Sequence, residues 1–207
     1  HGHSQKTNTG GENSKHGIWH SDLPAAFATM QRYQLKLAGI HMHIGSGVDY
    51  GHLEQVCGAM VRQVLESGQD LEAISAGGGL SIPYREGEED IDTGHYYGLW
   101  NAAREKIAAH LGHPVKLEIE PGRFLVAESG VLVAQVRSVK DMGSRHFVLV
   151  DAGFNDLMRP AMYGSYHHIT AIGADGRSLA DAPVVESVIA GPLCESGDVF
   201  TQQEGGK

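Results

Sequence analysis

The first 120 residues alternate between helical and extended hydrophobic patterns. Residues 21–34 begin with a Ser-Asp pair suited to cap a helix, place a Pro in the first turn and continue with good helix formers. Residues 51–68 carry apolar side chains at steps of three and one, which is the strongest helix signal in the chain. Residues 93–112 predict a further helix that ends at Gly112.

Shorter segments between these helices alternate apolar and polar residues with a period of two. Residues 37–44 place Ile and Met side chains on one face and His41 and His43 on the other. Residues 71–79 run into three glycines, and residues 115–123 carry acidic side chains on one face. Alternating helices and strands predict parallel strands joined by crossover helices. Polar groups on one strand face favour a barrel lumen over a sheet covered by helices on both faces.

After Phe124 the pattern becomes rich in strands. Four segments each predict a strand, namely residues 131–140, 145–153, 167–172 and 184–191. An Ala-Asp-Gly turn lies at residues 174–176. We therefore predict an α/β protein in which residues 1–124 form the second part of a (β/α)8 TIM-like barrel. Residues 125–207 are expected to form part of a C-terminal β-domain.

The ends of the sequence and the number of strands suggest a piece of a longer protein. The start has no initiator Met and no apolar signal core, and the end is polar and rich in glycine. Three clear barrel strands are too few to close an eight-stranded barrel. We expect an internal fragment whose remaining barrel strands lie upstream.

The composition and net charge of the chain indicate which kinds of binding partner it suits. The chain has 207 residues, 41% of them hydrophobic, and 16 Lys plus Arg against 25 Asp plus Glu, giving a net charge of -9. This acidic balance argues against nucleic acid or an anionic membrane surface as a partner and favours a small-molecule substrate. Two cysteines and the lack of a long apolar run fit a reduced, cytoplasmic setting.

Each predicted barrel strand ends in a glycine turn. His43 precedes Gly-Ser-Gly, residues 77–79 are Gly-Gly-Gly, and Glu120 precedes Pro-Gly-Arg. In a barrel, the carboxyl ends of the strands meet at one catalytic rim. Glycine turns with accessible N–H groups are suited to cradle a phosphate, so the convergence of three turns predicts an anion site there.

The two histidines leave three interpretations open. His41 and His43 could bind zinc, as in a barrel hydrolase, but such a site needs further ligands at later strand ends. Those ends supply only glycines and Glu120. The histidines could instead serve an organic cofactor, which we favour, or they could be hydrogen-bonded residues that fill the lumen.

Several polar residues near strand ends are further candidates. Glu120 could hold a protonated ring nitrogen and Arg123 could pair with a phosphate or carboxylate, although the two could also form a structural ion pair. Arg159 and Tyr163, in a long polar segment, could bind a carboxylate or be solvated. Cys194, in a glycine-bounded loop, could be a proton donor or nucleophile.

Five motifs in order carry a resemblance to a known family. They are HMHIGSG, AGGGL, EIEPGRFLV, DAGFNDLMRPAMYG and AGPLCESGD. Together they resemble the pyridoxal-phosphate-dependent decarboxylases of alanine-racemase-like fold, and within that family the enzymes that act on meso-diaminopimelate. The resemblance implies a lyase that releases carbon dioxide and L-lysine, with pyridoxal 5'-phosphate as cofactor. It also implies a homodimer with shared active sites.

The resemblance assigns cofactor-binding roles to residues of the rim. His43 would stack on the pyridine ring, and Glu120 would hold the ring nitrogen protonated. Ser46 would bind the phosphate together with the backbone of four glycines, Gly77, Gly78, Gly79 and Gly122. The Schiff-base lysine of the family lies upstream of this sequence, so we expect the fragment alone to be inactive.

The same resemblance assigns substrate-binding and catalytic roles. Arg123, Arg159 and Tyr163 would bind the distal carboxylate of meso-diaminopimelate, with Arg123 also beside the cofactor. Cys194, from a second subunit, would reprotonate Cα, and Glu195 would recognise the distal amino group. No metal is expected. The alternatives are the zinc hydrolase and a cofactor-free regulatory protein derived from the same fold.

Overall fold

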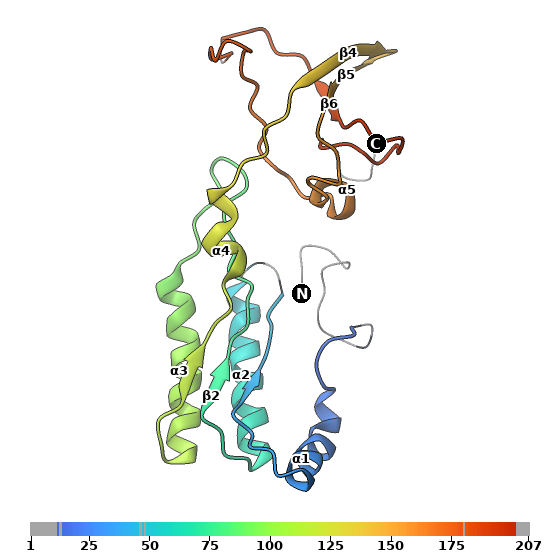
Figure 1. Cartoon of the computed structure of the whole chain (residues 1–207). Helices are drawn as coiled ribbons and strands as arrows, with labels where there is room; N and C mark the ends of the chain where they lie inside the picture. Colours follow the sequence, from blue (N-terminus) through green and yellow to red (C-terminus); the bar gives the residue numbers. More distant parts are fainter. Residues whose placement is uncertain (1–11, 13, 46, 48, 180, 202–207) are drawn as a thin grey trace. The chain divides into compact units, whose positions relative to one another are not determined.

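The chain forms two compact units in a computed structural model (Figure 1). The residues that the structure describes are 12, 14–45, 47, 49–179 and 181–201. The first unit comprises residues 1–82 and 89–129, and the second comprises residues 83–88 and 130–207. The expected domain boundary at residue 124 stays a prediction about the full-length protein.

A three-stranded parallel sheet forms the centre of the first unit. Its order is β1 (Gly39–His41), β2 (Ala73–Ser75) and β3 (Lys116–Glu118). One cross-strand row, Ile40 with Ile74 and Leu117, is apolar, and the next row is His41, Ser75 and Glu118. Parallel strands with helices between them confirm the α/β prediction. Each strand is shorter than the segment of alternating apolar and polar residues from which it was predicted.

Two long helices follow β1 and β2, and both match the predicted elements. The helix α2 (Tyr50–Ser67) begins at Asp49, whose side chain accepts two backbone N–H groups, and ends at Gly68. The helix α3 (Thr93–Leu111) begins at Asp92 and ends at Gly112, which has a φ of 79°. None of the helices in the described ranges is both long and apolar enough to cross a membrane.

The first helix differs from its prediction at its start. The helix α1 (Leu23–Arg32) follows a 3-10 turn, η2 (His20–Asp22). Asp22 occupies the capping position, but its side chain makes no capping hydrogen bond. The expected cap was therefore wrong, because the preceding 3-10 turn places Asp22 in a helical backbone conformation (φ -94°, ψ -5°) rather than an extended one.

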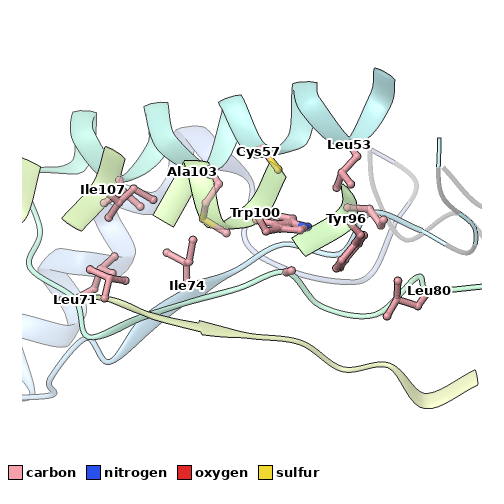
Figure 2. Packing of buried hydrophobic residues seen from close by; sticks show 14 residues of the cluster. Leu53, Cys57, Leu71, Ile74, Leu80, Tyr96, Trp100, Ala103 and Ile107 are labelled. Carbon is pink, nitrogen blue, oxygen red and sulfur yellow. The ribbon is translucent and has the colours of Figure 1, made fainter. Parts of the chain in front are cut away.

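The core of the first unit lies between the two long helices and the sheet (Figure 2). Trp100 and Ile107 of α3 are fully buried and belong to the same cluster as Leu53 of α2 and Ile74 of β2. Cys57 belongs to the same cluster, and burial raises the pKa of its thiol to about 11. The helices therefore cover the apolar face of the sheet, and the polar row with His41 lies on the other face.

The second unit contains a mixed sheet. The strands β4 (Val136–Met142) and β5 (Arg145–Val150) are antiparallel, and β6 (Ser187–Ala190) pairs in parallel with β5. The turn at residues 174–176 is present, with the Gly176 N–H donating to the Gly173 carbonyl.

Two local predictions in the chain after residue 120 were wrong. Residues 167–172 form no strand, because they have only an isolated bridge between Ile172 and Ser178 and no neighbouring strand to pair with in the described chain. A short helix, α4 (Gly122–Val126), with the 3-10 turn η3 (Ala127–Ser129), follows the third glycine turn. Another, α5 (Arg159–Tyr163), lies in the segment expected to be a polar loop.

Candidate functional site

The three glycine turns of the first unit meet at the carboxyl edge of the parallel sheet. The Gly47 N–H donates to the Gly79 carbonyl over 3.1 Å, which joins the first turn to the second. The Glu120 N–H donates to the Gly77 carbonyl over 2.8 Å, which joins the third turn to the second. The predicted convergence of these turns on one rim is therefore confirmed.

The middle turn leaves no room for side chains. A Cβ on Gly78 would lie 2.9 Å from the Glu120 carbonyl oxygen and 3.2 Å from Cε1 of His43. Gly79 has a φ of +110°, and a Cβ there would lie 2.7 Å from Cγ1 of Ile44. Glycines are required here because the backbone of each neighbouring turn approaches so closely. The result is a rim formed by backbone groups.

His43 is fixed by the middle turn. Its Nδ1 accepts the N–H of Gly78 over 3.1 Å, so Nδ1 carries no proton in this arrangement. Partial burial, with the neighbouring His41 as a smaller cause, lowers the pKa of the His43 imidazole from its ordinary value of 6.5. The ring is therefore a neutral acceptor of defined orientation at the rim.

His41 faces different partners. Its Nδ1 lies 3.1 Å from Oγ of Ser75 and 3.7 Å from Oε1 of Glu120. Ser75 Oγ in turn accepts the Gly77 N–H over 3.3 Å. A polar chain therefore runs from the middle glycine turn through Ser75 and His41 toward the Glu120 carboxylate.

These contacts bear on the zinc interpretation. His41 and His43 use their Nδ1 atoms for separate partners, Ser75 and the Gly78 amide. Across the described ranges, no three His, Cys, Asp or Glu side chains are grouped so that they could hold a metal ion. A zinc site on this histidine pair would need further ligands, and the described residues do not group them there.

The other candidates of the first unit lie at the third strand end. Glu120 has an exposed carboxylate, and the Gly122 N–H donates to the Glu120 carbonyl over 2.9 Å. Arg123 is half-buried in the first turn of α4. Ser46 lies outside the described residues. The amides of Gly77, Gly78 and Gly122 thus donate to acceptors within the rim.

Arg159 and Tyr163, at the two ends of α5 in the second unit, are both half-buried. An Nη2 of Arg159 donates to Oγ of Ser165 over 3.3 Å, and the guanidinium lies 5.9 Å from the ring centroid of Tyr84. Nε of Arg159 is buried and has no hydrogen-bond partner in the described part of the chain. Arg159 therefore keeps an unused donor in a partly desolvated position.

A histidine beside this arginine responds to its charge. His167 packs edge-on against Tyr84, with ring centroids 5.9 Å apart. Partial burial and, as a smaller cause, the positive charge of Arg159 lower the pKa of His167 from its ordinary value of 6.5. The neutral form of His167 leaves Arg159 as the cation of this cluster.

The loop that follows β6 carries the remaining candidates. Cys194 and Glu195 are both exposed, and Oε1 of Glu195 accepts the Gly197 N–H over 3.2 Å. Asp198, at the end of the same loop, is buried and accepts backbone N–H groups from two loops. Cys194 is thus an accessible thiol on a loop with a buried polar anchor.

The family of the chain follows from comparison with known proteins. Residues 1–127, which contain the whole glycine rim, match the family described as pyridoxal-dependent decarboxylase, pyridoxal binding domain. The chain belongs to this family. Within the pyridoxal-dependent decarboxylases it is 84% identical to "Diaminopimelate decarboxylase" of Escherichia coli strain K12, over 100% of this chain and 49% of that protein.

Solved structures give the same result for the fold. A crystal structure of diaminopimelate decarboxylase matches with a TM-score of 0.95 and 83% identity, over 100% of this chain and 49% of that one. The Helicobacter pylori diaminopimelate decarboxylase complexed with L-lysine matches with a TM-score of 0.74 and 30% identity, over 95% and 47%. The chain spans about half the length of these relatives, and its first unit is part of a TIM barrel.

The roles of two polar residues at these sites, Ser75 and Asp198, were not predicted from the sequence. Ser75 alternates with Ile74 on β2, so its place on the face of His41 could have been found from the period of two. Asp198 lies four residues after Cys194, and its bonds to Phe154 and Leu193 make it a buried anchor between two loops. No local pattern in the sequence indicates the bond to Phe154, which lies 44 residues away.

Proposed function

We propose that the full-length protein carrying this chain removes carbon dioxide from meso-2,6-diaminopimelate and releases L-lysine, with pyridoxal 5'-phosphate as cofactor. The observation that carries the proposal is the 84% identity with the E. coli diaminopimelate decarboxylase over the entire chain. The protein is thereby proposed to be a carboxy-lyase of lysine biosynthesis.

The rim of the first unit is suited to a planar, phosphorylated cofactor. Backbone amides at residues 77–79 and Gly122 offer donors where any Cβ on Gly78 or Gly79 would collide with neighbouring turns. In the structure, three of these amides donate to acceptors of the rim itself. Phosphate oxygens are charged acceptors and form stronger bonds, so they can replace the present acceptors. The neutral ring of His43 would pack on the cofactor ring, and Ser46 would add a hydroxyl.

Glu120 is proposed to hold the cofactor ring nitrogen in its protonated form. Bound pyridoxal phosphate supplies an electron sink for the pair of electrons left when carbon dioxide departs. A carboxylate next to the ring nitrogen favours the protonated, electron-accepting form. His41, 3.7 Å from the Glu120 carboxylate and held by Ser75, helps to orient that carboxylate.

The reaction breaks one bond and forms another at Cα. The bond between Cα and its carboxylate breaks, carbon dioxide leaves, and the electron pair stays on Cα. The Cys194 thiol is proposed to deliver the proton that completes Cα, and its exposure on a loop allows it to reach a bound molecule. In the proposed homodimer, Cys194 and Glu195 serve the site of the second subunit.

Recognition of the substrate requires a cation for its distal carboxylate. Arg159 has a buried Nε without a partner in the described chain, and its fork geometry suits a carboxylate. Tyr163 on the same short helix and Arg123 of the first unit are proposed to contribute to this recognition, and Glu195 is proposed to bind the distal amino group. A competing amino acid such as L-lysine, bound through its own α-amino group, has no carboxylate at its far end and would leave Arg159 unpaired.

The substitution Arg159→Ala tests the substrate assignment in the full-length protein. Loss of a buried charged partner should lower kcat/KM for meso-diaminopimelate by about 100-fold or more. Arg177→Ala is the matched control, because Arg177 lies exposed in a turn of the same unit and pairs with Asp175. Unchanged kcat/KM in Arg159→Ala would remove Arg159 from the proposed site.

Absorbance of bound cofactor separates the proposal from a regulatory protein of the same fold. The full-length protein should bind pyridoxal phosphate. It should then absorb light at wavelengths above roughly 300 nm, because the bound cofactor is conjugated. A full-length protein that folds but takes up no cofactor would favour the regulatory alternative. Activity that follows added zinc and is lost with a chelator would favour the hydrolase.

A further inference from the structure

Asp198 is a buried carboxylate that joins two loops of the second unit. Only 2% of the residue is exposed. Its Oδ1 accepts the Phe154 N–H over 2.6 Å, and its Oδ2 accepts the Leu193 N–H over 2.8 Å. A carboxylate is costly to bury unless it accepts such hydrogen bonds, and bonds to a charged acceptor are stronger than neutral ones.

Two glycines make room for this carboxylate. A Cβ on Gly191 would overlap the Asp198 carboxyl group, with Cγ only 2.6 Å away. A Cβ on Gly153 would lie 3.1 Å from both carboxyl oxygens. The backbone of each loop therefore comes as close to Asp198 as a residue without a side chain allows. This close approach is typical of a fixed junction between loops.

Each joined loop leads directly to a residue of the proposed chemistry. Leu193, whose amide is bound, immediately precedes Cys194. Phe154, the other bound residue, lies in the loop between β5 and α5, and α5 begins at Arg159.

The loops themselves are closed by backbone bonds. The Gly191 N–H donates to the Asp198 carbonyl over 2.8 Å, and the Leu157 N–H donates to the Gly153 carbonyl over 3.2 Å. The Asp198 carboxylate connects these two closed loops where they leave neighbouring parallel strands, β5 and β6. Displacement of one loop would therefore be transmitted to the other.

We propose that Asp198 is a positioning residue that fixes Cys194 and Arg159 relative to the same sheet. This inference rests on the proposed function for the roles of these two residues. In the proposed homodimer, Arg159 serves the site of its own subunit and Cys194 serves the second site. One carboxylate would then position one residue of each of the two active sites.

Amide hydrogen exchange of the full-length protein tests the junction without any measurement of activity. In Asp198→Ala, the segments 151–158 and 191–198 should both exchange faster, by about 10-fold, because two bonds of a buried charged acceptor are lost. The strands β4 and β5 should exchange as in the wild type. Faster exchange in only one of the two segments, or in neither, would overturn the proposal.

A conservative variant keeps the test decisive if Asp198→Ala does not fold. Asp198→Asn keeps one carbonyl oxygen as an acceptor, but its amide group faces the second backbone N–H. The exchange rates of both segments should therefore rise, but by less than in Asp198→Ala. The larger rise should occur in the loop whose N–H loses its acceptor. Wild-type exchange throughout both segments in Asp198→Asn would contradict the proposed junction.

Kinetics of the full-length enzyme test the consequence for catalysis. Asp198→Asn should lower kcat by about 10-fold through Cys194 and raise KM for meso-diaminopimelate through Arg159, since small misplacements of reacting groups are costly. The control Asp175→Asn changes an exposed carboxylate in the turn at residues 173–177 and should leave both constants unchanged. Unchanged kcat and KM in Asp198→Asn would refute the positioning role.

The two kinds of readout keep the two proposals apart. A wild-type protein without decarboxylase activity would contradict the proposed function, whereas the exchange of the two segments would still decide whether Asp198 joins them.

Discussion

At the scale of single residues, two histidines of one strand have different surroundings. His43 accepts the amide of Gly78, which fixes its ring against the middle glycine turn. His41 lies next to Ser75 and faces the Glu120 carboxylate. The pair is thus divided between the turn proposed to cradle a phosphate and the carboxylate proposed to bind the cofactor ring.

Gly79→Ala tests the close packing of the rim at the same scale. The φ of +110° and the overlap of a Cβ with Ile44 and the Gly45 carbonyl should destabilise the full-length protein by about 2 kcal/mol or more. Urea unfolding of the variant measures this loss.

Gly98→Ala is the matched control for that substitution. Gly98 lies in the interior of α3, and a Cβ there meets nothing within 4 Å. Alanine is the better helix former, so this variant should gain roughly 0.5–1 kcal/mol. Equal stability of the two variants would show that the glycine rim is not closely packed.

The limits of sequence analysis are clear from these residues. The period of two predicted that His41 and His43 share one face of their strand. The position of each glycine turn at a strand end predicted that the turns meet near these histidines. The bond from Gly78 to His43 depends on how two strand ends approach in space, and the bonds of Asp198 join residues 44 positions apart and 5 positions apart. Such pairings are not contained in any local pattern.

At the scale of elements, the long helices were predictable because each has its own signals. The helix α2 has an apolar stripe, a capping Asp49 and a terminal Gly68. The five-residue helices α4 and α5 are too short to show a period of 3.6 residues, and α5 was therefore taken for a loop. Consequently, the helix that carries Arg159 could be recognised only in the structure.

An ion pair beside the starts of β2 and β3 provides a test of element packing by pH. Nε2 of His113 lies 2.7 Å from Oδ1 of Asp70. The hydrogen bond to Asp70 raises the pKa of His113 above its ordinary 6.5, and the same bond lowers the pKa of Asp70 below its ordinary 3.8.

The sign of the effect follows from these two shifts. The contribution of His113 is complete below pH 6.5 and disappears as the pH rises through its raised pKa. The contribution of Asp70 is present above pH 3.8 and disappears as the pH falls through its lowered pKa. The pair should therefore stabilise the protein most between those two values.

His113→Gln should reduce the free energy of unfolding at pH 5 but make little difference at pH 9. Urea unfolding at both values measures this, with His110→Gln, an exposed histidine near the end of α3, as the control. Both groups of the pair are exposed, so the effect is small. A loss of stability that is the same at both pH values would contradict the ion pair.

At the scale of the whole molecule, each of the two units carries residues proposed to take part in the reaction. The first unit carries the glycine rim, His43 and Glu120, and the second carries Arg159 and Cys194. The alternation of helices and strands predicted the parallel sheet, and the motif order predicted the family. The contents of the second unit were less predictable, because its strands pair through both parallel and antiparallel ladders.

The most direct test of the central claim is the yield of carbon dioxide and L-lysine from meso-diaminopimelate by the full-length protein with pyridoxal phosphate. Wild type should form the two products in equal amounts, and Glu120→Gln should form them about 100-fold more slowly, because a neutral amide supports the charged ring nitrogen less well. Glu118→Gln, on the same face of β3, is the control and should resemble the wild type. No lysine from the wild type, or an undiminished rate in Glu120→Gln, would contradict the account.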